Sequence, residues 1–224
     1  MPIDYTKRRP EPAQGAGVSL SKVTLTKHAP TVSLSKQQGG NAASGELRVN
    51  LNWNARPAAG GGLFRRQGSG SIDLDLGCLY ELSDGRKGVV QALGNSFTSR
   101  NDGSPIISLD GDDRTGDSTE GENLRIDLSR LREVRRVLIF TYIYEGTPNW
   151  AGASAIVTLY PQGGAPIEIH LDEADPAART CAIALLESSG TDLSVRREVR
   201  YVQGTQSALD HAYNWGMSWT KGRK

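Results

Sequence analysis

Short runs of alternating apolar and polar residues recur along the chain and predict β-strands. The clearest is the run at residues 46–53 (ELRVNLNW), where every second residue from Leu47 to Trp53 is apolar. Such alternation sets one face of a strand on a core and turns the other toward solvent. Residues 134–144 (VRRVLIFTYIY) are the most apolar run of this kind, which predicts a central strand.

Similar runs separated by turn residues predict the rest of the fold. Further strands are expected at residues 23–27, 31–35, 71–82, 88–93, 105–109, 123–128, 154–160, 166–171, 179–187 and 194–202. Residues 179–187 fit a strand or a helix by periodicity, and their length and neighbours favour a strand. A helix is predicted at residues 207–215, ended by Gly216. About ten strands in this arrangement predict an all-β fold, a two-sheet antiparallel β-sandwich with a short C-terminal helix and few other helices.

Composition adds limits to this picture. Glycine accounts for 26 of 224 residues, which suits many turns and few helices. The net charge of +1 gives no pull toward nucleic acid, and no apolar run is long enough for a transmembrane segment. The basic N-terminus lacks the apolar core of a secretory signal. We expect a disordered tail or linker at 1–16, one sandwich domain at 17–220 and a basic tail at 221–224.

One acidic loop stands out against this balanced background. Residues 109–123 read LDGDDRTGDSTEGEN, with glycine at every fifth position from Gly111 and one opposing cation, Arg114. The loop holds six carboxylates: Asp110, Asp112, Asp113, Asp117, Glu120 and Glu122. Flexible backbone and clustered oxygen ligands suit Ca²⁺ better than Mg²⁺, which requires a tight octahedron. The spacing does not match an EF-hand, and the strand-like flanks place the loop between β-strands.

A second acidic motif lies upstream in a predicted strand. In residues 72–76 (IDLDL), Asp73 and Asp75 share one face and the leucines share the other. If this strand lies beside the acidic loop, the two segments together form an oxygen cage. Asn95, in the following loop, is placed to lend a side-chain carbonyl. The simpler alternatives are a solvated acidic turn and an ordinary surface strand.

Several segments resemble the tellurium-resistance and stress-response family of calcium-binding proteins, the TerD-like proteins, and most closely their TerA-like branch. The segments are GVSLSK at 17–22, VTLTK at 23–27, LNW at 51–53, IDLDLGCLYEL at 72–82 and DGDDRTG at 110–116. The chain departs from the TerD pattern after Gly116, and it has Asp113 where that pattern has asparagine. The resemblance implies a β-sandwich that binds Ca²⁺, cytoplasmic or peripheral to the membrane, with other tellurium-resistance proteins at the inner membrane face as partners.

The residues therefore predict a non-enzymatic module that binds one or two calcium ions. The expected ligands are Asp73, Asp75, Asp112, Asp113, Asp117 and Glu122, with Asp110, Asn95 and Glu120 as outer candidates. The alternative is a calcium-dependent carbohydrate- or protein-binding sandwich, in which late aromatic residues such as Trp150 stack on sugars. A hydrolase that uses the carboxylates is a third hypothesis, although the sequence has no nucleophile motif, phosphate loop or zinc spacing. Cys78 and Cys181 are expected to be buried free thiols.

Overall fold

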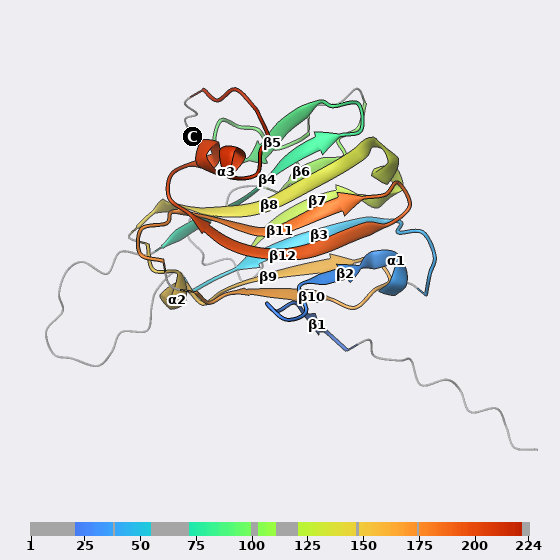
Figure 1. Ribbon diagram of the computed structural model, residues 1–224, viewed down its shortest axis with the longest axis horizontal. Coiled ribbons are helices and arrows are strands. Elements are labelled where there is room, and N and C mark those ends of the chain that lie inside the picture. The colour runs from blue at the N-terminus through green and yellow to red at the C-terminus, as the bar shows by residue number, and fades with distance from the viewer. Residues whose placement is uncertain are drawn as a thin grey trace, which may run out of the picture.

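Two six-stranded sheets pack face to face in this computed structural model, which describes residues 21–37, 39–54, 72–99, 103–110, 121–146, 148–173 and 175–220 (Figure 1). The first sheet runs in the order β1 (Val23–Thr24), β10 (Ile167–Leu171), β9 (Ala155–Pro161), β3 (Glu46–Asn52), β7 (Glu122–Asp127) and β6 (Ile107–Leu109). The second runs β2 (Thr31–Ser33), β12 (Leu193–Val202), β11 (Thr180–Ser188), β8 (Val134–Glu145), β4 (Asp73–Leu82) and β5 (Lys87–Gln91). The predicted sandwich is confirmed.

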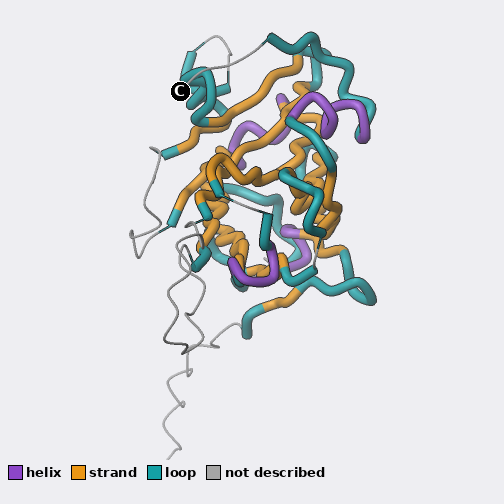
Figure 2. Tube along the Cα trace, turned by 90° about the vertical axis from the view of Figure 1, so that its left-hand side faces the viewer, coloured by secondary structure: helices purple, strands orange, loops and turns teal. Residues whose placement is uncertain are grey.

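Neighbouring strands pair in the antiparallel sense, apart from the short parallel pair of β1 and β10. The helical elements are short: α1 (Leu34–Gln37), a 3-10 helix (Leu128–Glu133), α2 (Trp150–Ala153) and α3 (Gln206–Ala212). They lie around the strands rather than between the sheets (Figure 2). The described part of the chain has no helix with both the length and the apolar character that a bilayer span requires.

The main core fills the space between the sheets, as the alternation of β3 predicts. Leu47, Val49 and Leu51 of β3 have no exposed surface, and they belong to the same apolar cluster as Leu74 and Leu76 of β4. A strand that alternates in this way buries one face at each second residue. The predicted inner face of both strands is therefore confirmed.

A second apolar cluster covers the outer face of the second sheet. Leu79 of β4 and Phe140 of β8 pack there with Leu209 of α3 and with Trp215. Strand β4 is thus buried on both faces, and all its residues after Asp73 are buried. In Figure 1 α3 lies against the same end of the sheet as β4 and β5.

The runs at 23–27 and 31–35 form strands of different sheets, because β1 pairs with β10 in one sheet and β2 with β12 in the other. The chain then forms α1, which the alternating pattern does not predict. The C-terminal helix ends at Ala212 rather than Trp215, because Asn214 and Gly216 adopt positive φ angles of 51° and 78°.

Candidate metal centre

The first component of the candidate site is the acidic strand β4. Leu74 and Leu76 face the main core, so strand alternation turns Asp73 and Asp75 to the opposite face. Asp75 lies opposite Tyr142 of β8 and has no exposed surface, whereas Asp73 is half-buried and lies opposite Glu145. The two aspartates share a face as expected, but Asp75 is buried rather than directed to solvent.

The second component is Glu122, the first residue of β7 in the other sheet. It is 2% exposed, and its Oε2 atom accepts a hydrogen bond from the backbone N–H of Leu76 at 2.5 Å. The acidic loop of residues 111–120 ends directly before this strand. The hydrogen bond therefore places Glu122, which follows the acidic segment 111–120, against the acidic strand.

The Leu76 amide is available to Glu122 because the pairing of β4 with β5 ends before Leu76. The ladder between β4 and β5 ends where Gly77 lies opposite Gln91, because the chain then turns away at residues 92–95. The N–H groups of Leu82 and of the alternate residues before it face β5, so the amide of Leu76 lies just beyond the end of β5. A buried N–H requires an acceptor, and the Glu122 carboxylate provides it.

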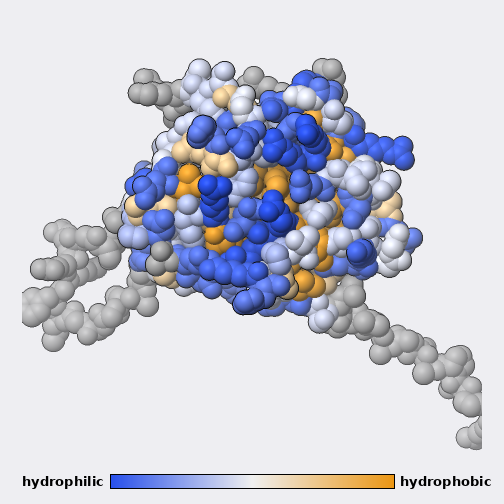
Figure 3. Space-filling model, viewed as in Figure 1, coloured by the Kyte–Doolittle hydropathy of each residue, from blue (hydrophilic) through white to orange (hydrophobic). Residues whose placement is uncertain are grey.

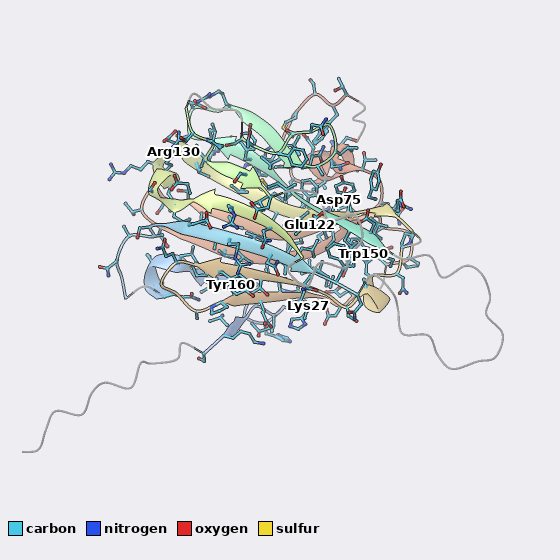
Figure 4. All side chains as sticks on the ribbon, turned by 180° about the vertical axis from the view of Figure 1, so that it is seen from behind. Lys27, Asp75, Glu122, Arg130, Trp150 and Tyr160 are labelled. Carbon is cyan, nitrogen blue, oxygen red and sulfur yellow. The ribbon has the colours of Figure 1, made fainter. Side chains whose placement is uncertain are left out.

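The two buried carboxylates of this region come from the two different sheets. Figure 4 shows Asp75 and Glu122 near each other at one end of the sandwich. Within the described residues, however, no group of three or more His, Cys, Asp or Glu side chains is gathered closely enough to hold a metal ion. A complete metal site would therefore need further oxygen ligands beyond these two carboxylates.

The other expected ligands have mixed positions. Asn95 is exposed, in a turn after β5 with φ of 53°, and its N–H bonds the Ala92 carbonyl. Asp112, Asp113, Asp117 and Glu120 lie outside the described residues. Whether any of the expected residues binds a metal stays a prediction.

Asp110 lies on the exposed face of the first sheet and is matched by a cation. Its carboxylate accepts from Nε and Nη2 of Arg125 at 3.1 and 2.9 Å, and Arg125 also pairs with Glu46 at 2.7 Å. The hydrogen bonds of Asp110 and then of Glu46 raise the pKa of the Arg125 guanidinium. Asp110 is thus already balanced by an arginine, unlike the position expected of a calcium ligand.

A buried carboxylate at the other end of β4 has a different environment. Glu81 is 3% exposed, and its two oxygens accept from Arg135 and Arg136, both at 2.7 Å. Burial alone would raise the pKa of Glu81, but the hydrogen bond and charge of Arg136, with Lys87 and Arg135, lower it. Glu81 was not singled out from the sequence, because the register that sets it opposite Arg136 is not visible there.

The tryptophan and the two cysteines considered in the sequence analysis are buried. Trp150 is 1% exposed and its indole N–H donates to the Ala178 carbonyl at 2.8 Å, so its ring packs in the core and does not offer a sugar platform. Cys78 and Cys181 are buried free thiols, as expected, and burial raises the pKa of both.

Comparison with known proteins tests the resemblance to the tellurium-resistance family. No protein-family model matches the chain. The tellurium resistance protein TerA of Alcaligenes sp. is 44% identical over 208 residues, which cover 92% of this chain and 60% of that protein. The resemblance to the tellurium-resistance proteins is confirmed. The chain spans about three fifths of the length of this TerA relative.

Two solved structures share the fold of this chain. A protein of unknown function, SAV2460, matches with a TM-score of 0.55 at 14% identity, over 75% of this chain and 95% of that one. A homologue of telluride resistance protein TerD from Streptomyces coelicolor A3(2), SCO6318, matches with a TM-score of 0.50 at 19% identity, with the same coverage. At these identities the likeness supports the sandwich fold alone.

Proposed function

We propose that the chain is a non-enzymatic calcium-binding module that acts in tellurium resistance. The observation that carries this proposal is the hydrogen bond from the Leu76 amide to Glu122, which joins the acidic loop to the strand that carries Asp75. The name of the TerA relative supports the biological setting. Calcium would be bound by oxygen atoms from both sheets at this end of the sandwich.

The chemistry of the available groups fits calcium. Carboxylates are hard oxygen ligands, and Ca²⁺ accepts six to eight of them in flexible geometry. Two carboxylates that are 0% and 2% exposed are costly to keep ionised, and a divalent cation beside them offsets that cost. Asp75 and Glu122 would form the buried side of the shell. Asp73 and oxygens of residues 111–120 would form the rest, with Asn95 at its margin.

Calcium at this position would join the two sheets. Asp75 belongs to the second sheet and Glu122 to the first, so an ion held by both adds a link across the sandwich. Binding to the folded state alone stabilises a protein by mass action. We propose that the module works in the cytoplasm or at the inner membrane face, with other tellurium-resistance proteins as partners.

Calorimetric titration with CaCl₂ tests the proposal directly. Wild-type protein should bind calcium at micromolar concentration or below, and Glu122→Gln should bind at least about tenfold more weakly, a loss of about 1.4 kcal/mol. Glutamine keeps an acceptor for the Leu76 amide, so the substitution removes the charge with little change in shape.

A matched control is Glu168→Gln on β10, where the carboxylate pairs with Lys22 at 2.9 Å. It should leave calcium binding unchanged. Absence of binding heat in the wild type, with an unchanged melting temperature, would contradict the proposal, as would equal losses in both variants.

A further inference from the structure

A groove runs along the outer edge of β5, beneath the C-terminal segment of residues 216–220. One part is lined by Tyr80, Arg86, Lys87, Val89, Met217 and Trp219. A second part of the groove shares Trp219 with the first and extends past Leu93, Ser96 and Gln206. Val89, Leu93, Met217 and Trp219 are partly buried against the outer apolar cluster, so the groove has an apolar floor.

The C-terminal side of this groove is held in place by hydrogen bonds to one buried carboxylate. Asp210 is 5% exposed and accepts from the backbone amides of Gly216 and Met217 at 2.8 and 2.9 Å. It also accepts from the indole N–H of Trp219 at 2.9 Å. These three bonds fix residues 216–219 beside α3, and the Lys87 ammonium donates to the Trp215 carbonyl at 2.5 Å, so both sides of the groove are held by the folded chain.

The other side of the groove is a strand edge with unused hydrogen-bonding groups. Strand β5 is the last strand of its sheet, and the pairing of Leu82 with Arg86 turns the N–H and C=O groups of Lys87, Val89 and Gln91 outward. The Val89 carbonyl and the Gln91 amide are bonded to Ser96. Within the described residues, nothing pairs with the Lys87 N–H, the Lys87 carbonyl or the Val89 N–H.

The charge near this edge is positive. Arg86, Lys87, Arg135 and Arg136 lie at this end of the β4–β5 hairpin and of β8, against the carboxylates of Asp84 and Glu81. With Asp210, which bonds the C-terminal segment, four cations stand against three anions and leave a local charge of +1. None of the described residues that line the groove is acidic. An acidic ligand therefore meets complementary charge here.

We propose that the β5 edge is a docking site for an extended acidic peptide of a partner protein. The peptide adds a strand beside residues 87–89, forms hydrogen bonds with the three unused backbone groups and directs alternate apolar side chains toward Val89, Met217 and Trp219. Strand addition takes its affinity from main-chain hydrogen bonds and its specificity from side-chain pockets beside the edge. The acidic residues of the peptide alternate to the other face, on the side of Arg86.

The probe is a short fluorescein-labelled peptide that alternates valine and glutamate, and binding is followed by fluorescence anisotropy with the full chain. The valine–glutamate peptide should bind, and an analogue with lysine in place of glutamate should bind at least about tenfold more weakly. An analogue with N-methylated backbone amides keeps its charge but loses strand pairing, so it should not bind. Amide hydrogen exchange at Val89 should slow when the unmodified peptide is present.

Two charge-reversal variants test whether the charge of Arg86 at the groove contributes to peptide binding. Arg86→Glu reverses an exposed charge in the hairpin turn and should weaken peptide binding about fivefold, whereas Lys36→Glu makes the same charge change on α1, away from the groove, and should leave binding unchanged. Equal binding of the N-methylated peptide, no protection of Val89, or no binding of the valine–glutamate peptide would each overturn the proposal. A dimer seen by light scattering that the peptide dissociates would show that a second copy occupies this edge, and would also overturn it.

Discussion

The two ends of β4 bury carboxylates in different ways. At one end, Glu81 is held between the guanidinium groups of Arg135 and Arg136. At the other, Asp75 is fully buried on the strand, and Glu122 reaches from the opposite sheet to the Leu76 amide. One strand thus carries an ion-pair network at one end and a gathering of negative charge at the other.

The two ends differ in the charged groups that surround the buried carboxylates. Arginine side chains neutralise Glu81, and the Arg136 guanidinium also lies 3.9 Å from the centre of the Trp215 ring, so this end is fixed by internal contacts. At the Asp75 end, Glu122 follows the acidic segment 111–120, whose carboxylates lie outside the described residues. Clustered carboxylates favour a bound cation. We therefore expect calcium to affect one end of β4 and not the other.

The largest effect is expected from Arg136→Ala. This change leaves the buried Glu81 with one exposed arginine and removes the contact with Trp215, so the free energy of unfolding should fall by about 3 kcal/mol. Urea unfolding measures the loss, and it should be the same with calcium and with EDTA. Arg135→Ala is the matched control, because that side chain is 68% exposed and its loss should cost about 1 kcal/mol or less. Equal losses would contradict this description of the Glu81 end.

A second prediction concerns the calcium-dependent part of stability. In wild-type protein, calcium at about 100 times its dissociation constant should raise the free energy of unfolding by about 2.7 kcal/mol. Glu122→Gln should lose most of this increment because the ion loses a buried charged ligand. Chemical unfolding with calcium and with EDTA gives the increment, and Glu81→Gln should keep it in full. An undiminished increment in Glu122→Gln would remove this residue from the site.

The third prediction concerns how the stability contributed by Glu81 depends on pH. The pKa of Glu81 is lower in the folded state than in the unfolded state, so the unfolded state binds more protons as the pH falls. Its contribution is therefore complete above the ordinary glutamate pKa of about 4.3 and is lost as the pH falls through the lower folded pKa. Acid unfolding of Glu81→Gln in EDTA should show a flatter dependence in this range. A steeper dependence than in the wild type would contradict the sign.

The smallest effect is expected in the hairpin turn between β4 and β5. Arg86 pairs with Asp84 at 2.7 Å, but the two side chains are 49% and 51% exposed. Such pairs contribute little because water and salt screen them, so Arg86→Ala should change the free energy of unfolding by about 0.5 kcal/mol or less. A loss above that range in urea unfolding would mean that the turn contributes more than its exposed contacts suggest.

The sequence predicts where the strands of this fold lie along the chain better than it predicts which strands pair with each other. Alternation identified β3 and the acidic strand β4, because a period of two is a local property of the chain. Sheet membership depends on long-range register, so the sequence did not predict that β1 and β2 belong to different sheets. The helix α2 was not predicted either, since it is a single turn begun by the Asn149 side chain.

In the candidate site, too, the acidic residues could be predicted from the sequence but their contacts could not. Asp73 and Asp75 were recognisable as acidic residues of a strand, whereas Glu122 was expected in the acidic loop and is the first residue of β7. The hydrogen bond between Glu122 and the Leu76 amide could not be predicted, since it follows from the early end of β5 at Gln91. The arginine partner of Asp110 was missed for a similar reason, because Arg125 reaches it across the pairing of β6 with β7.

The most direct test of the calcium site is the stability of Asp75→Asn with and without calcium. Without calcium, neutralising this buried charge beside other carboxylates should leave stability unchanged or raise it by about 1 kcal/mol. With saturating calcium, the same substitution should lower the stability by about 2 kcal/mol relative to wild type, because the ion loses a buried ligand. This reversal of sign is the predicted result. A loss of equal size in calcium and in EDTA would show that Asp75 is a structural residue and would contradict the proposed site.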